Sequence, residues 1–257
     1  MSRVACVACG LVFLLAGWQS EACAREELPF LRVAVDTPNP PFAVLDKRGN
    51  VSGFDVDITY ALCTELKRTC IIKPMAFEGI ISAIVAEEVD IAVAGMGVTE
   101  ERLRLVDFTD KYYRSLSLYI GRRGVVRGLS PEELKGLRIG AQRDTIQEQY
   151  LRQHFKNTAT IVPVATQDTA LNMASNGQLD LVLVDGLGGY AFLKTEAGAV
   201  LEIFGDPLAD ANMTSACIAV SKKQPELRDA INHALQTLRR NGEYGKINRK
   251  YFNFNIY

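Results

Sequence analysis

The segment GMGVTEERLRLVDFTDKYY, residues 95–113, places an arginine where a helix normally carries an acid. Thr99 is a favoured N-cap residue, so Arg102 falls at the third helical position, beside the partial positive charge of the helix N-terminus. Its side chain should lean back over residues 95–98, whose backbone N–H groups are free. A guanidinium beside such donors suits a carboxylate or a phosphate. A surface ion pair with Glu101 or Asp107 is the alternative, and spacing alone does not separate the two.

Polar residues or bare backbone also follow apolar strands elsewhere in the chain. Four predicted strands end at Asp36, Gly95, Gln142 and Asp185, and Thr145 then begins a helix. Ligands of open α/β sheets bind beyond the carboxyl ends of the strands. Two of these ends fall in each half of the chain, so their convergence predicts a ligand site between the halves.

Asp185 and Phe77 each have two interpretations. Asp185 can cap the helix that begins at Gly186, a role that needs no ligand. It can also bind an ammonium group opposite Arg102. Arg102 and Asp185 together would then suit the carboxylate and the ammonium group of an amino-acid zwitterion. Phe77 is either a core residue or a wall for ligand stacking, and the core is the commoner place for an aromatic side chain.

Short apolar strands alternating with amphipathic helices must position these residues, a pattern that predicts parallel α/β sheets. Strands are expected at 31–36, 70–75, 90–95, 137–142, 160–165 and 179–185, with extended segments at 112–121 and 214–222. Helices are expected at 55–69, 79–88, after Thr99, from SPEEL (130–134), at 145–155, 166–177, after Asp185 and at 225–242. The last carries one apolar face, formed by Leu227, Ile231, Ala234, Leu235 and Leu238.

Two complete βαβαβ blocks predict an α/β protein of two lobes, joined by the two extended segments, with a cleft between them. Lobe 1 is expected to hold residues 25–115 and a return segment, 215–257, and lobe 2 residues 116–214. The hydrophobic fraction of 48%, the charged fraction of 23% and the net charge of −1 indicate a soluble globular protein. They provide no basic patch of the size that nucleic-acid binding needs.

Residues 1–24 have the features of a secretory signal peptide, which predicts an exported protein. Arg3 precedes an apolar run too short to span a bilayer, and Ala22-Cys23-Ala24 matches a cleavage site. A membrane anchor or a lipidated Cys23 is the less favoured alternative. Export would leave Cys63, Cys70 and Cys217.

The three remaining cysteines have different surroundings. Cys63 lies late in a helix and Cys70 opens the next strand, so either a disulfide or two separate thiols is compatible with the sequence. Cys217, in ACIAV, is most simply a buried free thiol.

The ordered set PPF, GFDVDI, AGMGVTEER, DFTDKYY, the 142–147 turn, LVLVDG and YFNFNIY resembles the periplasmic amino-acid-binding proteins of ABC importers. It is most similar to the lysine/arginine/ornithine- and histidine-binding proteins, with some glutamine-binding character. The resemblance implies a type II periplasmic binding protein fold, two lobes that close over a free L-amino acid, an inner-membrane permease as partner, a monomer, and no cofactor or metal.

The resemblance also implies roles for individual residues. Arg102 would hold the α-carboxylate, helped by backbone at Gly95 and Gly97 and by Thr145, and Asp185 would hold the α-ammonium. Phe77 would wall the side-chain pocket, and Asp36 would reach the distal amine of a lysine-type ligand. The binding residues implied in the second-lobe turn are Gln142, Thr145 and Gln147. Cys63 and Cys70 match the disulfide pair of the basic-amino-acid binders.

Several residues depart from that pattern. Asn39 replaces a second aromatic residue, which leaves the aromatic sandwich half missing, and Ala94 and Gly97 replace serines. Arg143 and Asp144 replace a neutral turn that contains glycine. These changes keep the backbone donors but bear on side-chain specificity, for which arginine, then lysine or ornithine, is favoured and glutamine is the runner-up.

Two other functions compete with amino-acid transport. A periplasmic dehydratase acting on prephenate or arogenate shares this fold and would need a general acid over the substrate ring. The histidines, His154 and His233, lie on predicted helices away from strand ends, although Asp36 could serve as the acid. A detached sensor domain is the third possibility, and the absence of a later membrane span argues against it.

Overall fold

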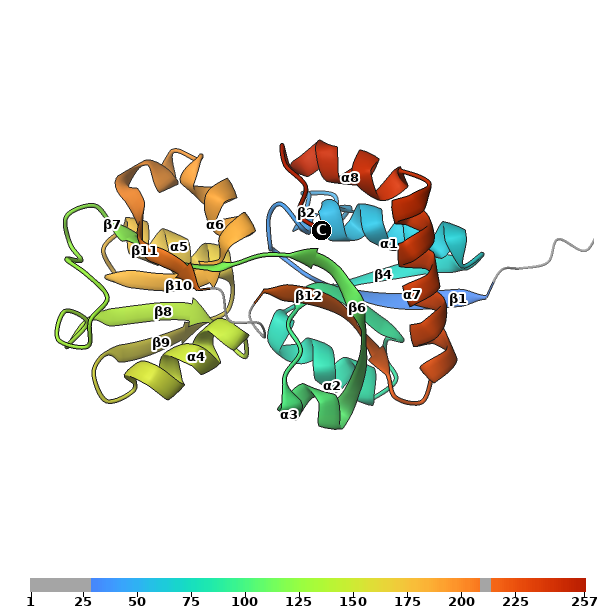
Figure 1. Cartoon of the computed structure of the whole chain (residues 1–257), viewed down its shortest axis with the longest axis horizontal. Coiled ribbons are helices and arrows are strands. Elements are labelled where there is room, and N and C mark those ends of the chain that lie inside the picture. Colours follow the sequence, from blue (N-terminus) through green and yellow to red (C-terminus); the bar gives the residue numbers. More distant parts are fainter. Residues whose placement is uncertain (1–28, 209–213) are drawn as a thin grey trace, which may run out of the picture.

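The computed structural model describes residues 29–208 and 214–257, which form two α/β lobes around two five-stranded sheets (Figure 1). The predicted signal peptide lies outside the described residues. Within the described ranges, no helix is both long enough and apolar enough to cross a membrane.

Lobe 1 is built on a sheet with the strand order β4-β1-β5-β12-β6. Its strands are β1 (Phe30–Asp36), β4 (Thr69–Met75), β5 (Ile91–Met96), β6 (Val106–Arg114) and β12 (Ser215–Ser221). Strands β4, β1 and β5 are parallel, whereas β12 runs antiparallel to both β5 and β6. A two-stranded ribbon of β2 (Val44–Leu45) and β3 (Val51–Ser52) accompanies this lobe.

Helices cover both faces of the lobe 1 sheet. They are α1 (Phe54–Glu65), α2 (Ile80–Val85) after a 3₁₀ turn (Phe77–Gly79), α3 (Glu100–Leu105), α7 (Pro225–Arg240) and α8 (Glu243–Tyr251). Helices α1, α7 and α8 share one hydrophobic core with the sheet, and α2 packs in a second core. The predicted apolar face of α7 is confirmed, since all five of its residues are buried.

Lobe 2 repeats the plan with the strand order β11-β7-β10-β8-β9. Its strands are β7 (Ser117–Arg122), β8 (Arg138–Gln142), β9 (Thr160–Val164), β10 (Leu181–Asp185) and β11 (Leu201–Leu208). Its helices are α4 (Ile146–Phe155), α5 (Gln167–Ser175), α6 (Gly186–Leu193) and a 3₁₀ turn (Ala197–Val200). Helix α4 packs on one face of the sheet, and α5 and α6 on the other.

Two predicted elements differ in the structure. SPEEL does not form a helix: Ser130 and Glu133 make the reciprocal hydrogen bonds of a capping box, but the turn stops at Gly136, which has φ +77°. Forming the first turn of a helix is unfavourable in free energy, and a capping box stabilises a helix only if enough residues follow to extend it. The extended segment expected at 112–121 is present, but as two strands, β6 and β7, which are interrupted at Ser115 and Leu116 where the chain changes lobe.

The crossing between the lobes lies at Ser115 and Leu116. The Ser115 N–H donates to the Thr214 carbonyl (3.1 Å), which ties the outgoing chain to the returning one. The Leu116 carbonyl accepts from the Gly186 N–H (2.7 Å) in lobe 2. The return between β11 and β12 passes through residues 209–213, which lie outside the described part of the chain.

A disulfide joins Cys63 and Cys70, with the two Cα atoms 5.9 Å apart, and it links the end of α1 to β4. Cys217 is a free cysteine, 5% exposed, and burial raises the pKa of its thiol to about 11.

We expect the mature chain to show no reactive thiol when folded and one after denaturation without reductant, because a buried thiol is little ionised and poorly accessible. Three thiols after denaturation would contradict the disulfide.

Candidate functional site

A cavity between the lobes encloses about 630 Å³ of space not occupied by atoms, part of it open to solvent. It lies beyond the carboxyl ends of β1, β5, β8 and β10, where polar residues were predicted to converge. The ten residues singled out from the sequence all line it: Asp36, Asn39, Phe77, Gly95, Gly97, Arg102, Gln142, Thr145, Gln147 and Asp185. Among residues 29–208 and 214–257, three charged residues line it: Asp36, Arg102 and Asp185.

Arg102 occupies the predicted position at the start of α3. Thr99 caps the helix, its hydroxyl accepting from the Arg102 N–H (3.2 Å). The guanidinium donates to the Gly97 carbonyl (2.6 Å) and, across the cleft, to the Asp144 carbonyl (2.7 Å). It also lies 5.4 Å from the centre of the Phe77 ring. These contacts direct Arg102 into the cleft.

The surface ion pair considered for Arg102 is not formed. Neither Glu101 nor Asp107 makes a salt bridge with it, and Asp107 pairs with Arg228 instead (3.6 Å). Burial lowers the pKa of Arg102 to about 10, and the nearby charges of Asp144 and Glu101 only partly oppose this. The cation is therefore partly desolvated and has no bonded anion among the described residues, which favours binding of an anionic group.

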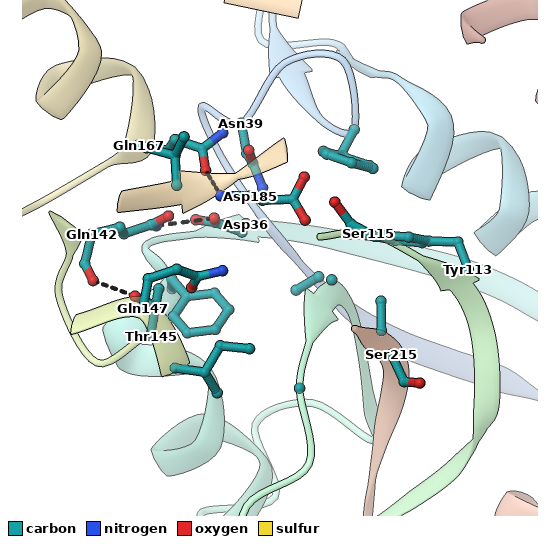
Figure 2. Close-up of a pocket in the computed structure, with 18 of the residues that line it drawn as sticks. Asp36, Asn39, Tyr113, Ser115, Gln142, Thr145, Gln147, Gln167, Asp185 and Ser215 are labelled. Carbon is teal, nitrogen blue, oxygen red and sulfur yellow. Dashed lines mark hydrogen bonds between the residues drawn. The ribbon is translucent and has the colours of Figure 1, made fainter. Parts of the chain in front are cut away.

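Asp36, at the end of β1, faces Gln142, at the end of β8, across the cleft (Figure 2). Gln142 Nε2 donates to Asp36 Oδ2 (3.1 Å), while the buried Oδ1 has no hydrogen-bond partner among the described residues. Asp36 is 2% exposed, and burial raises its pKa to about 6 despite the Gln142 hydrogen bond and the nearby Phe77 backbone. The unpaired oxygen makes Asp36 an acceptor for a donor from outside the protein.

Asp185 combines the two roles considered for it. One carboxylate oxygen caps α6, accepting from the Leu187 (3.0 Å) and Gly188 (3.2 Å) N–H groups. The same residue lines the cavity beside Ser115 (Figure 2). Burial raises the pKa of Asp185, and the Ser115 hydrogen bond lowers it in part. A capping role therefore does not prevent Asp185 from contacting a ligand.

Gly95 is held by a buried network rather than left with a free N–H. Its N–H donates to the Tyr112 hydroxyl (2.8 Å), which donates to Asp55 (2.8 Å) in α1. The residue has φ +61°, and a Cβ there would lie 2.4 Å from the Tyr113 hydroxyl. Only glycine fits this position, but the structure shows that its N–H is already used.

The remaining predicted residues contribute shape and hydrogen-bonding capacity. Phe77 is 8% exposed and belongs to the α2 core, so it is both a core residue and a cavity wall. Thr145 caps α4 and donates its hydroxyl to the Gln142 carbonyl (2.6 Å). Gln147 Nε2 donates to Ser117 (3.0 Å) within lobe 2. The side chain of Asn39 makes no hydrogen bond with another described residue.

Further polar residues line the cavity but were not predicted as site residues: Tyr113, Ser115, Gln167, Thr214 and Ser215. Gln167, 7% exposed, accepts from the Asp185 N–H (2.7 Å) and so fixes the approach to α6 (Figure 2). It follows β9, so the strand-end rule would have found it had that strand been included. Ser115 lies at the crossing between lobes, which no periodicity marks.

The lobes are in contact beside the cavity. The Asp36–Gln142 and Arg102–Asp144 hydrogen bonds cross the cleft, and Arg143 forms a salt bridge with Glu78 (2.7 Å) at its exposed rim. Leu187, at the start of α6, packs into the main core of lobe 1. Within the described residues, no group of three or more His, Cys, Asp and Glu side chains could hold a metal ion.

The family description for bacterial extracellular solute-binding proteins, family 3, matches residues 31–254. The L-arginine-binding protein of Pseudomonas aeruginosa is 34% identical, over 88% of this chain and 89% of that protein.

Three solved structures share the fold. An ancestral arginine-binding protein bound to arginine is 32% identical with a TM-score of 0.80, covering 87% of this chain and 98% of that one. A structure of an ancestral arginine-binding protein bound to glutamine is 31% identical with a TM-score of 0.79, covering 88% and 98%. An ancestral amino-acid-binding protein described as a precursor of cyclohexadienyl dehydratase is 26% identical with a TM-score of 0.77, covering 87% and 96%.

Proposed function

Because the chain belongs to the family 3 bacterial extracellular solute-binding proteins, we propose that it captures free L-arginine between its lobes and delivers it to an ABC importer. The observation that carries this proposal is the set of charges around the cavity. In the part of the chain that the structure describes, the site offers one cation, Arg102, and two anions, Asp36 and Asp185. L-Arginine offers the complement, one carboxylate and two cationic groups.

Each end of the ligand has a matching protein group. Arg102 binds the α-carboxylate with the guanidinium N–H groups that do not bond to the Gly97 and Asp144 carbonyls. The carboxylate then serves as the counter-ion of the Arg102 cation, whose pKa is lowered by burial. Asp185 binds the α-ammonium from lobe 2 with the carboxylate that also caps α6. Ligand binding to both lobes would stabilise their closed arrangement.

The side-chain end favours a cation over a neutral amide. Asp36 keeps one buried oxygen without a partner, and a buried carboxylate without a cation is costly. Phe77 provides a face on which a guanidinium can stack. L-Glutamine would satisfy Arg102 and Asp185 but would leave Asp36 without a counter-ion, which ranks it below arginine.

The proposal includes a periplasmic location, a monomer, lobe 1 formed by residues 25–115 and 215–257, and lobe 2 by residues 116–214. The predicted signal peptide, residues 1–24, and the Cys63–Cys70 disulfide support export. Membership of a family of bacterial extracellular solute-binding proteins supports the periplasmic location and the importer as partner.

The test is calorimetry on ligand-stripped protein with L-arginine, L-lysine, L-ornithine, L-histidine and L-glutamine. We expect L-arginine to bind most tightly. Tighter binding of L-glutamine than of every basic amino acid would overturn the assignment. Because of the similarity to a dehydratase precursor, the same preparation is incubated with prephenate and arogenate; turnover of either would favour the enzyme alternative, for which Asp36 is the available proton donor.

A further inference from the structure

The side-chain end of the cavity is assembled from both lobes. Asp36 comes from lobe 1 and Gln142 from lobe 2, and they meet at 3.1 Å. Both are largely buried, at 2% and 7% exposed. The hydroxyl of Thr145 donates to the Gln142 carbonyl (2.6 Å), which holds this residue at the start of the α4 turn.

The hydrogen bond between them fixes which way each side chain faces. A carboxylate only accepts, so the Gln142 amide must present Nε2 to Asp36 and keep its oxygen for another donor. No described residue donates to Gln142 Oε1, and Asp36 Oδ1 is buried without a partner. The cavity therefore presents two acceptors that no described residue uses, one charged and one neutral, and one from each lobe.

This pair matches a guanidinium better than an alkylammonium. A guanidinium carries five N–H donors in a plane, so after it bonds the carboxylate it still has donors to satisfy. The Gln142 oxygen provides an acceptor in the cavity for one of them. An ammonium has three donors and is compact, so the Asp36 carboxylate and water satisfy more of its needs.

Resting on the proposed function, we infer that Gln142 is a specificity-determining residue that selects arginine over lysine by accepting a guanidinium N–H opposite Asp36. Gln142 reaches Asp36 from the other lobe, so this selection operates only when the lobes are together. Gln142 then acts after the ligand has entered, and its contribution lies in how long arginine is retained.

The experiment replaces Gln142 by methionine, which keeps the length of the side chain and removes its polar atoms. We expect the dissociation constant for L-arginine to rise on the order of tenfold, because a buried donor is left without an acceptor. The constant for L-lysine should change by less than about threefold. Stopped-flow measurements should place the loss for arginine in the dissociation rate, with the association rate unchanged.

Gln147→Met is the matched control, because Gln147 lines the same cavity but bonds Ser117 within its own lobe. It should change the arginine and lysine affinities by similar factors. An arginine-to-lysine ratio that stays at the wild-type value in Gln142→Met, or falls equally in Gln147→Met, would overturn the inference, as would a loss confined to the association rate. Thermal unfolding checks that both variants fold.

Failure of the proposed function would look different. A wild-type protein that binds no basic amino acid would reject the function itself. A wild-type protein that binds arginine, with Gln142→Met leaving its preference over lysine intact, would reject only the role of Gln142.

Discussion

Replacement of Arg102 by alanine is expected to weaken L-arginine binding by roughly 30- to 5,000-fold, the equivalent of about 2–5 kcal/mol for a buried charge-assisted pair. The ligand carboxylate would be enclosed without a cation, since Arg102 is the one basic residue among the described residues that line the cavity. Every L-amino acid carries this carboxylate, so affinity for L-glutamine should fall by a comparable factor. Calorimetry with both ligands measures the effect.

Stability of the ligand-free protein should respond in the opposite direction. Burial lowers the pKa of Arg102, which means that the folded state disfavours its charge. Removing the guanidinium should therefore leave the unfolding temperature of ligand-free protein unchanged or raise it. Arg104→Ala is the matched control, because Arg104 is on the same helix and exposed. Near-wild-type affinity in Arg102→Ala, or an equal loss in Arg104→Ala, would refute the carboxylate-binding role.

Asp36→Asn is expected to reduce L-arginine affinity by roughly 100-fold at neutral pH, because the buried guanidinium loses its counter-ion. In the wild-type protein, protonation of Asp36 at low pH should weaken arginine binding for the same reason. With a pKa of about 6, Asp36 is mostly ionised at pH 7 and mostly protonated at pH 5. Arginine affinity should consequently be about tenfold lower at pH 5 than at pH 7.

Other buried carboxyl groups also have raised pKa values and must be separated from Asp36. Burial also raises the pKa of Asp185, and protonation there would weaken the binding of every amino acid through its ammonium group. The pKa of buried Asp55 lies well above its usual range. A loss at pH 5 that is larger for L-arginine than for L-glutamine, and that disappears in Asp36→Asn, identifies Asp36. Arginine affinity that survives Asp36→Asn unchanged would remove the stated cause of specificity.

The pH dependence of the stability of the ligand-free protein tests the pKa of Asp36 independently of ligand binding. The pKa of Asp36 rises from 3.8 to about 6 on folding, so the folded state binds more protons between these values. The contribution of Asp36 to stability is therefore present at low pH and lost as the pH rises to about 6. Asp36→Asn should unfold at a higher temperature than wild type at pH 7, although it binds arginine less well.

The fold was largely readable because its signals are local and repeated. Two examples are the apolar face of α7, formed by Leu227, Ile231 and Leu235, and the N-cap of α3 at Thr99. In both cases the residues of the helix itself, and not distant parts of the chain, determine the element. SPEEL shows the limit of such reasoning. Its capping contacts form, yet residues after Glu133 do not continue a helix, so a correct local signal led to a wrong element.

Prediction of the candidate site had a different limit. Strand ends brought Asp36, Gln142 and Asp185 to one cavity because parallel sheets place their carboxyl ends on one edge. The Asp36–Gln142 contact could not be predicted, since it depends on how two separately folded lobes meet. The use of the Gly95 N–H by Tyr112 was equally hidden, because it depends on the path of β6 through the lobe 1 core.

The position of β12 has a consequence for how the chain is made. This strand lies between β5 and β6, yet the chain reaches it only after the whole of lobe 2. In a chain that emerges N-terminus first, lobe 2 can complete its sheet from β7 to β11 without waiting, whereas β5 and β6 keep facing edges unpaired. Lobe 1, which carries Arg102 and Asp36, is therefore completed last. The amino acid can stabilise the fold only when synthesis of the chain is nearly complete. Until β12 is added, the unpaired edges of β5 and β6 are the places where mispairing is most dangerous.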